Sequence, residues 1–180
     1  KELAPENAFR GGIKVIKSDL IPVTSDQLYG NKYLADIFMT YIPMLNELIG
    51  INPSPEKTAM IGSSMGGLCT LNAIAMHGNR FHTALALSTH WVLGGDPLVD
   101  SLIENIPQPG NHNIYMSRGT KGLDSQYQPF QERADNLMLA KGYRINQDFM
   151  SKVHARTGHN EKSWASYIDE PIGFWLKSIS

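Results

Sequence analysis

Two neighbouring serines stand among glycines in the stretch Ala59–Leu68, which reads AMIGSSMGGL. Its residues 62–66 fit the pattern G-x-S-x-G, with an apolar run before them and an apolar helical pattern after them. In such a strand–turn–helix setting the central residue, Ser64, occupies a sharp, strained turn that exposes its hydroxyl as a nucleophile. Glycine is expected at Gly62 and Gly66 because side chains there would collide with the neighbouring strand and helix.

The helix that follows this turn supplies a positive end for a developing negative charge. Its first amides and its dipole point at the space above Ser64, where a tetrahedral oxyanion would form, so we expect the Met65 N–H to bind the oxyanion. Ser63 is expected on the wall of the substrate pocket. The alternative is that Ser63 and Ser64 only cap a helix and that the glycines only turn the chain.

A serine hydroxyl is a weak nucleophile, so this hypothesis requires a histidine base and an acid, in the chain order Ser, acid, His. His159 lies in ARTGHNEKSW, directly after the last predicted strand and before the last predicted helix, and is the expected base. His90, in LSTHW, comes too early in this order and is assigned to the pocket wall, with a structural hydrogen-bonding role as the alternative. The remaining histidines are interpreted as surface or terminus residues: His77, His82, His112 and His154.

The acid should follow the third predicted strand, since the carboxyl ends of parallel strands share one edge of the sheet. Asp124, in SRGTKGLDSQY, has this place and would accept a hydrogen bond from one ring nitrogen of His159. A helix N-cap is its alternative role. The other carboxylates considered lie in less suitable elements: Asp96, Asp100, Asp135, Asp148 and Glu161.

The elements that must position these residues alternate between strands and helices. After a loop-rich start with one β-like run, Ile13–Ile16, apolar residues recur at helical spacing from Leu34 to Ile49, and Gly50 ends that helix. Strands are predicted at Thr58–Ile61, Phe81–Ser88, Asn113–Ser117 and Ile145–Val153, and helices at Leu68–Met76, Pro97–Asn105, Tyr127–Lys141 and after the cap residue Asn160. This order predicts a mostly parallel sheet covered on both faces.

Composition bounds the class of protein. A chain of 180 residues, 42% hydrophobic and 18% charged, is expected to form one globular domain over residues 1–180. A net charge of -1, without a cluster of Lys and Arg, argues against nucleic acid as a partner. Cys69 is the only cysteine, so an intrachain disulfide and a thiolate metal cluster are excluded. We expect no membrane association, because no apolar run approaches the roughly 18–20 residues of a span; a cytoplasmic and an exported location both stay open.

With these residues placed, the chain resembles the putative esterase family of the α/β-hydrolase superfamily, an esterase D-like group that includes feruloyl, acetyl-xylan and siderophore esterases and S-formylglutathione hydrolases. The resemblance rests on IGSSMGGL, ALSTHW, GTKGLDSQYQPFQ followed by a helix and KGY, and GHNEKSW, in the family's order from about Tyr33 to Leu176. It implies an α/β-hydrolase fold with Ser64, Asp124 and His159 as the catalytic residues.

The resemblance also implies a longer chain. Family members have several strands before the segment that starts here, and a loop after one of them supplies the second oxyanion-hole amide. We therefore expect residues 1–180 to be the C-terminal part of a longer polypeptide that lacks the N-terminal strands. An unpaired sheet edge would result, which a partner such as a second copy could cover.

The predicted function is hydrolysis of a small-molecule or carbohydrate-linked carboxylic ester through an acyl-enzyme, with no metal or cofactor. Trp91, beside His90, is expected to line the pocket, with a place in the core as its alternative. Two other functions stay open: acyl transfer to an alcohol by the same residues, and a non-catalytic hydrolase-like module without a full oxyanion hole.

Overall fold

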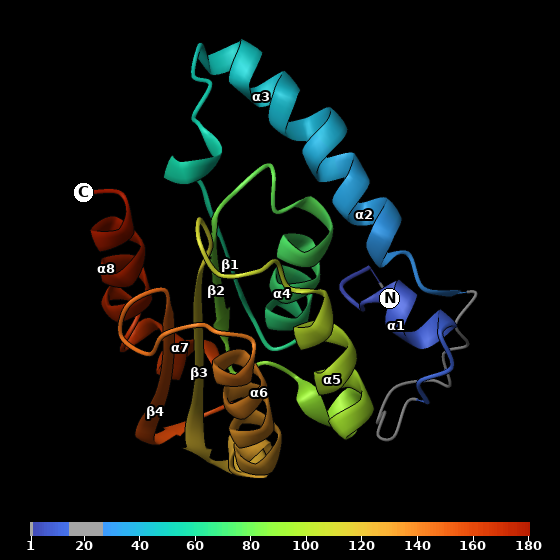
Figure 1. The fold of residues 1–180 in the computed structure, drawn as a ribbon, viewed down its shortest axis with the longest axis vertical. Helices are drawn as coiled ribbons and strands as arrows, with labels where there is room; N and C mark the ends of the chain where they lie inside the picture. The colour runs from blue at the N-terminus through green and yellow to red at the C-terminus, as the bar shows by residue number, and fades with distance from the viewer. Residues whose placement is uncertain (1, 15–26) are drawn as a thin grey trace.

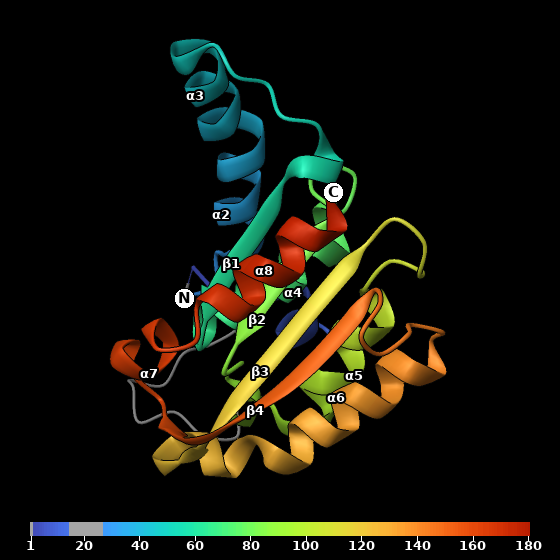
Figure 2. The same cartoon turned by 90° about the vertical axis from the view of Figure 1, so that its left-hand side faces the viewer.

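The computed structural model describes residues 2–14 and 27–180, and within them a parallel four-stranded sheet forms the centre of the molecule (Figure 1). The strands are β1 (Ala59–Ser63), β2 (Thr83–Leu87), β3 (Asn113–Lys121) and β4 (Phe149–Gly158), and they lie side by side in chain order (Figure 2). The run Ile13–Ile16 cannot be compared as a whole, because residues 15 and 16 lie outside the described residues.

The helices cover both faces of this sheet, which confirms the predicted fold class. Among the described residues they are α1 (Glu6–Arg10), α2 (Gly30–Asp36), α3 (Ile42–Ile49), α4 (Met65–His77), α5 (Gly95–Asn105), α6 (Gln128–Ala140), α7 (Glu161–Ala165) and α8 (Asp169–Ser178). A π-helical segment, η2 (Ile37–Tyr41), joins α2 to α3, and short 3-10 helices occur at η3 (Pro55–Lys57), η4 (Trp91–Leu93) and η5 (Gly122–Tyr127). Figure 1 shows α4, α5 and α6 on one face and α7 and α8 on the other.

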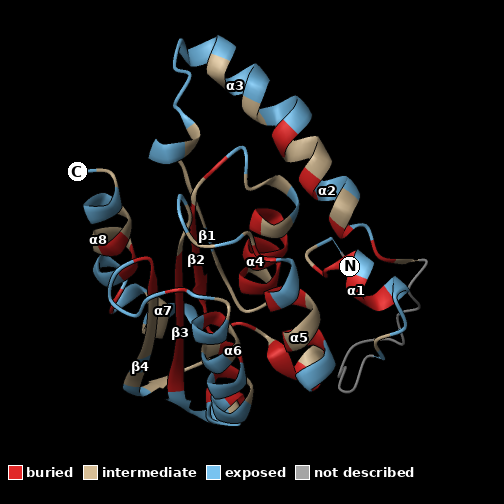
Figure 3. Cartoon of the chain, viewed as in Figure 1, coloured by how far each residue is buried: buried red, intermediate tan, exposed pale blue. Residues whose placement is uncertain are grey.

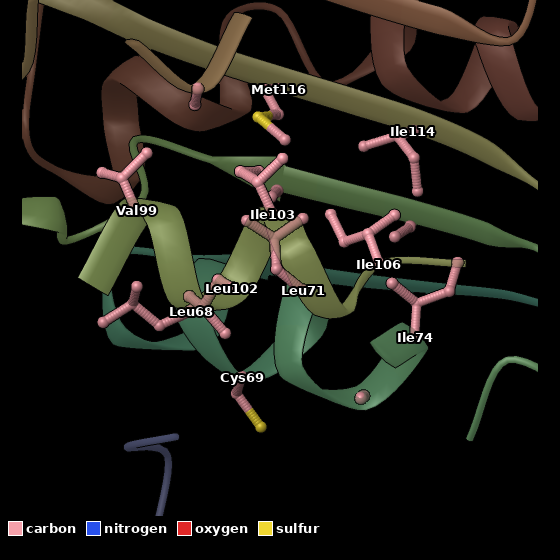
Figure 4. Packing of buried hydrophobic residues seen from close by; sticks show 14 of the residues in the cluster. Leu68, Cys69, Leu71, Ile74, Val99, Leu102, Ile103, Ile106, Ile114 and Met116 are labelled. Atoms are coloured by element: carbon pink, nitrogen blue, oxygen red, sulfur yellow. The ribbon is translucent and has the colours of Figure 1, made fainter. Parts of the chain in front are cut away.

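The two hydrophobic clusters follow the alternation of side chains along each strand. In β2, Ala84 and Ala86 belong to the cluster under α4, α5 and α6, whereas Leu85 and Leu87 belong to the cluster under α8. The small alanines let α4 approach the sheet closely. Figure 4 shows the larger cluster, in which the labelled residues are Leu68, Cys69, Leu71, Ile74, Val99, Leu102, Ile103, Ile106, Ile114 and Met116.

The fourth strand differs from its prediction. It begins at Phe149, not at Ile145, and runs to Gly158. Asn146 adopts a positive φ of 61° within a turn in which the Gln147 N–H donates to the Arg144 carbonyl, so the chain enters the sheet only after this turn. The alternation from Ile145 to Val153 therefore predicted the right element, but it placed both ends of the strand too early in the sequence.

The predicted long helix forms, and most of α3 is exposed (Figure 3), including several apolar residues. It passes through α2, η2 and α3 and ends at Gly50, whose φ of 67° is the left-handed conformation typical of a helix stop. Phe38 packs in the core, but the side chains further along are solvent-exposed: Tyr41, Met44, Leu45, Leu48 and Ile49, with Leu48 at 80% exposure. In the part of the chain that the structure describes, β1 has β2 on one side and no strand on the other.

Candidate active site

The turn between β1 and α4 has the strained geometry that the G-x-S-x-G pattern predicts. Ser64 is the N-cap residue of α4 and adopts φ 58° and ψ -121°, a conformation that L side chains rarely take. Gly62 is required by close packing, because a Cβ there would overlap the Gly66 carbonyl group and lie 2.9 Å from Thr70 Oγ1. A side chain at Gly62 would therefore push α4 away from β1.

The expectation for Gly66 is wrong. A Cβ on Gly66 meets no atom within 4 Å, because this residue lies on an open side of the first turn of α4. The second crowded glycine is Gly67, where a Cβ would lie 2.9 Å from Thr89 Oγ1 and 3.2 Å from Thr89 Cα. Close packing thus fixes α4 against both β1 and the loop after β2.

The structure brings together the three residues that the sequence singles out. His159 Nε2 lies 2.7 Å from Ser64 Oγ, and His159 Nδ1 lies 2.6 Å from Asp124 Oδ1. Ser64 follows β1, Asp124 lies in η5 after β3, and His159 follows β4, so all three occur at the carboxyl ends of strands. Asn160, directly after His159, caps α7 by accepting a hydrogen bond from the Ser163 N–H at 3.0 Å, as the sequence predicts.

Asp124 is fully buried and its two oxygens have separate partners. Oδ1 faces His159, while Oδ2 accepts hydrogen bonds from Ser88 Oγ at 2.6 Å and from the Gly119 N–H at 2.7 Å. Burial raises the pKa of Asp124, but the hydrogen bonds from His159, Ser88 and Gly119 outweigh it and leave the pKa below its ordinary value. The carboxylate is therefore held in its charged, accepting form.

The N-cap alternative for Asp124 does not apply. The residue before α6 is Tyr127, and that helix end has no side-chain capping hydrogen bond.

His90 lies against the same site. Its backbone N–H donates to the Ser64 carbonyl at 3.2 Å, its Nδ1 is 2.7 Å from Tyr127 Oη, and its ring centroid is 6.2 Å from that of His159. Burial lowers the pKa of His90, and the nearby His159 lowers it further. A structural hydrogen bond is thus present, and a role of His90 in the pocket wall stays a prediction.

The prediction that Trp91 lines the pocket is wrong, and its alternative place in the core is correct. Its side chain is 0% exposed, packs in the larger hydrophobic cluster and donates its indole N–H to Gln131 Oε1 at 3.3 Å. It fills the core because η4 turns the chain inward directly after His90.

Ser63 ends β1 half-buried, and Met65 begins α4, where a first-turn N–H has no acceptor within its helix. The roles of Ser63 and Met65 stay predictions.

Three side chains around the site were not singled out from the sequence: Ser88, Tyr127 and Trp164. Trp164 donates its indole N–H to Ser88 Oγ at 3.0 Å, and its ring meets the His159 ring edge-on with centroids 5.1 Å apart. Tyr127 also meets His159 edge-on, at 5.5 Å. The available signal for Ser88 was its position at the carboxyl end of β2, the strand next to the Ser64 turn.

The cavities alone would not identify this site. A cavity of about 640 Å³ lies at the opposite end of the sheet, where the strands begin. His82, directly before β2, and Asn113, the first residue of β3, line this cavity, and Ser64 does not. A smaller cavity of about 510 Å³ opens beside His159, between Lys121 and Arg156. Hydrogen-bond geometry, not cavity size, marks the candidate site.

Neither a metal-binding cluster nor a membrane-spanning helix occurs among the described residues. No group of three or more His, Cys, Asp or Glu side chains in residues 2–14 and 27–180 is placed to hold a metal ion. No helix among the same residues combines the length and apolar character needed to cross a bilayer.

Comparison with solved structures agrees with the fold. An IroE-like serine hydrolase from Shewanella oneidensis superposes with a TM-score of 0.70 at 15% identity, over 97% of this chain and 55% of its own. The enterobactin esterase FES from Shigella flexneri gives a TM-score of 0.64 at 17% identity, over 83% of this chain and 40% of its own. At these identities the likeness establishes the fold alone, which is an α/β-hydrolase fold.

Sequence comparison identifies the family. Residues 25–172 match the family described as "Putative esterase", and the chain belongs to that family. The uncharacterized protein YbbA of Bacillus subtilis (strain 168) is 27% identical over 125 residues, which are 68% of this chain and 46% of that protein. The chain thus spans about half the length of this curated relative.

Proposed function

We propose that this protein is a serine esterase in which Ser64 is the nucleophile, His159 the general base and acid, and Asp124 the residue that orients His159. The observation that carries the proposal is the unbroken hydrogen-bonded path from Ser64 Oγ through both ring nitrogens of His159 to Asp124. Membership of an esterase family supports ester hydrolysis as the reaction.

Proton positions follow from the buried carboxylate. Asp124 can only accept at Oδ1, so His159 carries its proton on Nδ1 and presents a lone pair from Nε2 to the Ser64 hydroxyl. In the first half-reaction Ser64 Oγ bonds to the ester carbonyl carbon while its proton moves to Nε2. That proton then passes to the departing alcohol oxygen as the carbon–oxygen bond breaks.

Water completes the cycle in the second half-reaction. His159 takes a proton from water, the resulting hydroxide attacks the acyl carbon, and Ser64 regains its proton as the acid leaves. The negative charge on the carbonyl oxygen in both steps falls near the first turn of α4. The Met65 N–H is the donor we assign to it, because the strained turn at Ser64 aims this helix end at the reacting carbon.

A second donor is not assigned to any described residue. The expectation that it comes from a segment preceding residue 1 stays a prediction. Tests of activity therefore belong on the complete natural polypeptide, since loss of one donor typically costs about 10²- to 10³-fold in rate.

The test compares Ser64→Ala with the parent protein on p-nitrophenyl acetate. We expect hydrolysis to be abolished and the melting temperature to stay nearly unchanged, because the Ser64 hydroxyl contributes little packing. Near-parental activity in Ser64→Ala would refute the assignment. Ser151→Ala is the matched control, because it removes a serine hydroxyl that is bonded to Asp135 outside the candidate site, and it should retain hydrolysis.

Acyl transfer remains the second candidate within the same chemistry. An acceptor alcohol would replace water in the second half-reaction, and no described side chain separates the two outcomes. Product analysis with and without added alcohol decides between them. A small-molecule or carbohydrate-linked ester is the proposed substrate class in either case.

A further inference from the structure

Ser88 is a buried hydroxyl held in a strained conformation at the end of β2. It is 0% exposed, and its φ of 44° lies in the left-handed region that costs an L residue roughly 1–2 kcal/mol. Its backbone N–H donates to the Ser117 carbonyl at 2.7 Å, which ties the strained residue to the end of β3. Glycine would adopt this conformation without the penalty, so the side chain must contribute something that offsets the strain.

The hydroxyl of Ser88 links two parts of the candidate site. Its oxygen accepts the Trp164 indole N–H at 3.0 Å, and since an indole nitrogen only donates, the hydroxyl proton is left to point at Asp124 Oδ2, 2.6 Å away. Trp164 also touches the His159 ring edge-on. A directed chain thus runs from Trp164 through Ser88 to Asp124, behind the hydrogen bond between Asp124 and His159.

We propose that Ser88 is a positioning residue that fixes the plane of the Asp124 carboxylate, so that one carboxylate oxygen stays directed at His159 Nδ1. This inference rests on the proposed function, in which Asp124 orients His159.

The geometry explains why a second donor is needed. Oδ2 has the Gly119 N–H at 2.7 Å as its other partner, so without Ser88 this oxygen would be restrained by one donor instead of two. Ser88 directly follows β2 and Gly119 lies in β3, so the two donors to Oδ2 come from different segments of the chain. Because Ser88 is fully buried, it cannot contact a substrate, and its effect should fall on kcat and not on KM.

Two substitutions separate the hydroxyl from the strain. Ser88→Ala removes the hydroxyl and keeps the strained Cβ, while Ser88→Gly removes both. We expect kcat for p-nitrophenyl acetate to fall about tenfold to a hundredfold in both variants, the range for a hydrogen bond to a charged group, with KM unchanged. Ser88→Gly should nevertheless melt at a higher temperature than Ser88→Ala.

A purely structural role predicts a different result. Activity would then follow stability, so that Ser88→Gly recovers kcat relative to Ser88→Ala, and this recovery would overturn the proposal. Unchanged kcat in Ser88→Ala would do the same.

Ser151→Ala is the matched control. The Ser151 hydroxyl donates to Asp135 Oδ2 at 2.8 Å, a second serine–aspartate pair away from the candidate site, and its loss should change kcat less than twofold.

One readout is independent of turnover. Proton NMR follows the His159 Nδ1–H that lies in the hydrogen bond to Asp124, and we expect its resonance to shift equally in Ser88→Ala and Ser88→Gly but not in Ser151→Ala. An unshifted resonance in both Ser88 variants contradicts the positioning role. If the parent protein does not hydrolyse esters but the resonance shifts as expected, the proposed function fails and the positioning of Asp124 by Ser88 stands.

Discussion

Replacing Asp124 by asparagine should reverse the hydrogen-bond direction at His159. In the parent protein Oδ2 accepts from two donors, Ser88 Oγ and the Gly119 N–H. The asparagine must therefore place its single oxygen there and turn its NH₂ group toward His159 Nδ1, because an NH₂ group cannot accept those two bonds. His159 Nδ1 then becomes an acceptor and its proton moves to Nε2. In this form Nε2 cannot take the proton of Ser64.

The expected fall in kcat of Asp124→Asn depends on the catalytic groups that the substitution leaves intact. Ser64, the first turn of α4 and the binding surface are unchanged, so a fraction of the catalysis survives. We expect kcat to fall about 10³- to 10⁴-fold, or about 4–5.5 kcal/mol in transition-state energy. His159→Ala should lose more, since it removes proton transfer itself.

The assay is kcat and KM for p-nitrophenyl acetate near neutral pH, with Asp135→Asn as the control. Asp135 is a carboxylate that also accepts two side-chain hydrogen bonds, from Gln131 and Ser151, outside the candidate site. The control should keep its activity within about twofold, an effect below 0.5 kcal/mol. An Asp124→Asn variant that keeps more than a tenth of the parental kcat would refute the reasoning and point to another acid. A variant in which only KM changes would do the same.

Two further predictions concern stability. Gly62→Ala should lower the free energy of unfolding by about 1–3 kcal/mol or more, because its Cβ overlaps the Gly66 carbonyl. Gly66→Ala, whose Cβ meets no atom within 4 Å, should leave the free energy of unfolding unchanged or raise it. Urea titrations measure both variants, and equal stabilities would contradict the packing argument. The pKa of Asp124 is lowered in the folded protein, so its ionised form stabilises the fold above its ordinary pKa of 3.8, and this contribution is lost as pH falls through the folded-state pKa. The stability difference between the parent and Asp124→Asn should therefore shrink below about pH 4, and a difference that grows on acidification contradicts the sign.

The fold and the three candidate catalytic residues could be predicted from the sequence, because they depend on short sequence patterns and on the order of the elements along the chain. The G-x-S-x-G turn, the Asn160 cap and the alternation of strands and helices each depend on neighbouring residues, and parallel strands bring their carboxyl ends to one edge. Ser64, Asp124 and His159 could therefore be placed together without coordinates.

The remaining features depend on distant contacts. Ser88 looks like any strand-end serine until Asp124 and Trp164 are seen to meet it. Trp91 follows a strand on the active edge, yet η4 directs it into the core, and no pattern in LSTHW distinguishes this from a pocket position. The crowding at Gly67 likewise comes from Thr89, across the space between α4 and the end of β2.

Covalent labelling with a fluorophosphonate, followed by peptide mass spectrometry, tests the central claim most directly. The account predicts a single adduct on Ser64 in the complete natural polypeptide, lost in His159→Ala because the hydroxyl is then no longer activated. An adduct on Ser63, or no adduct on Ser64 in a folded protein, would contradict it.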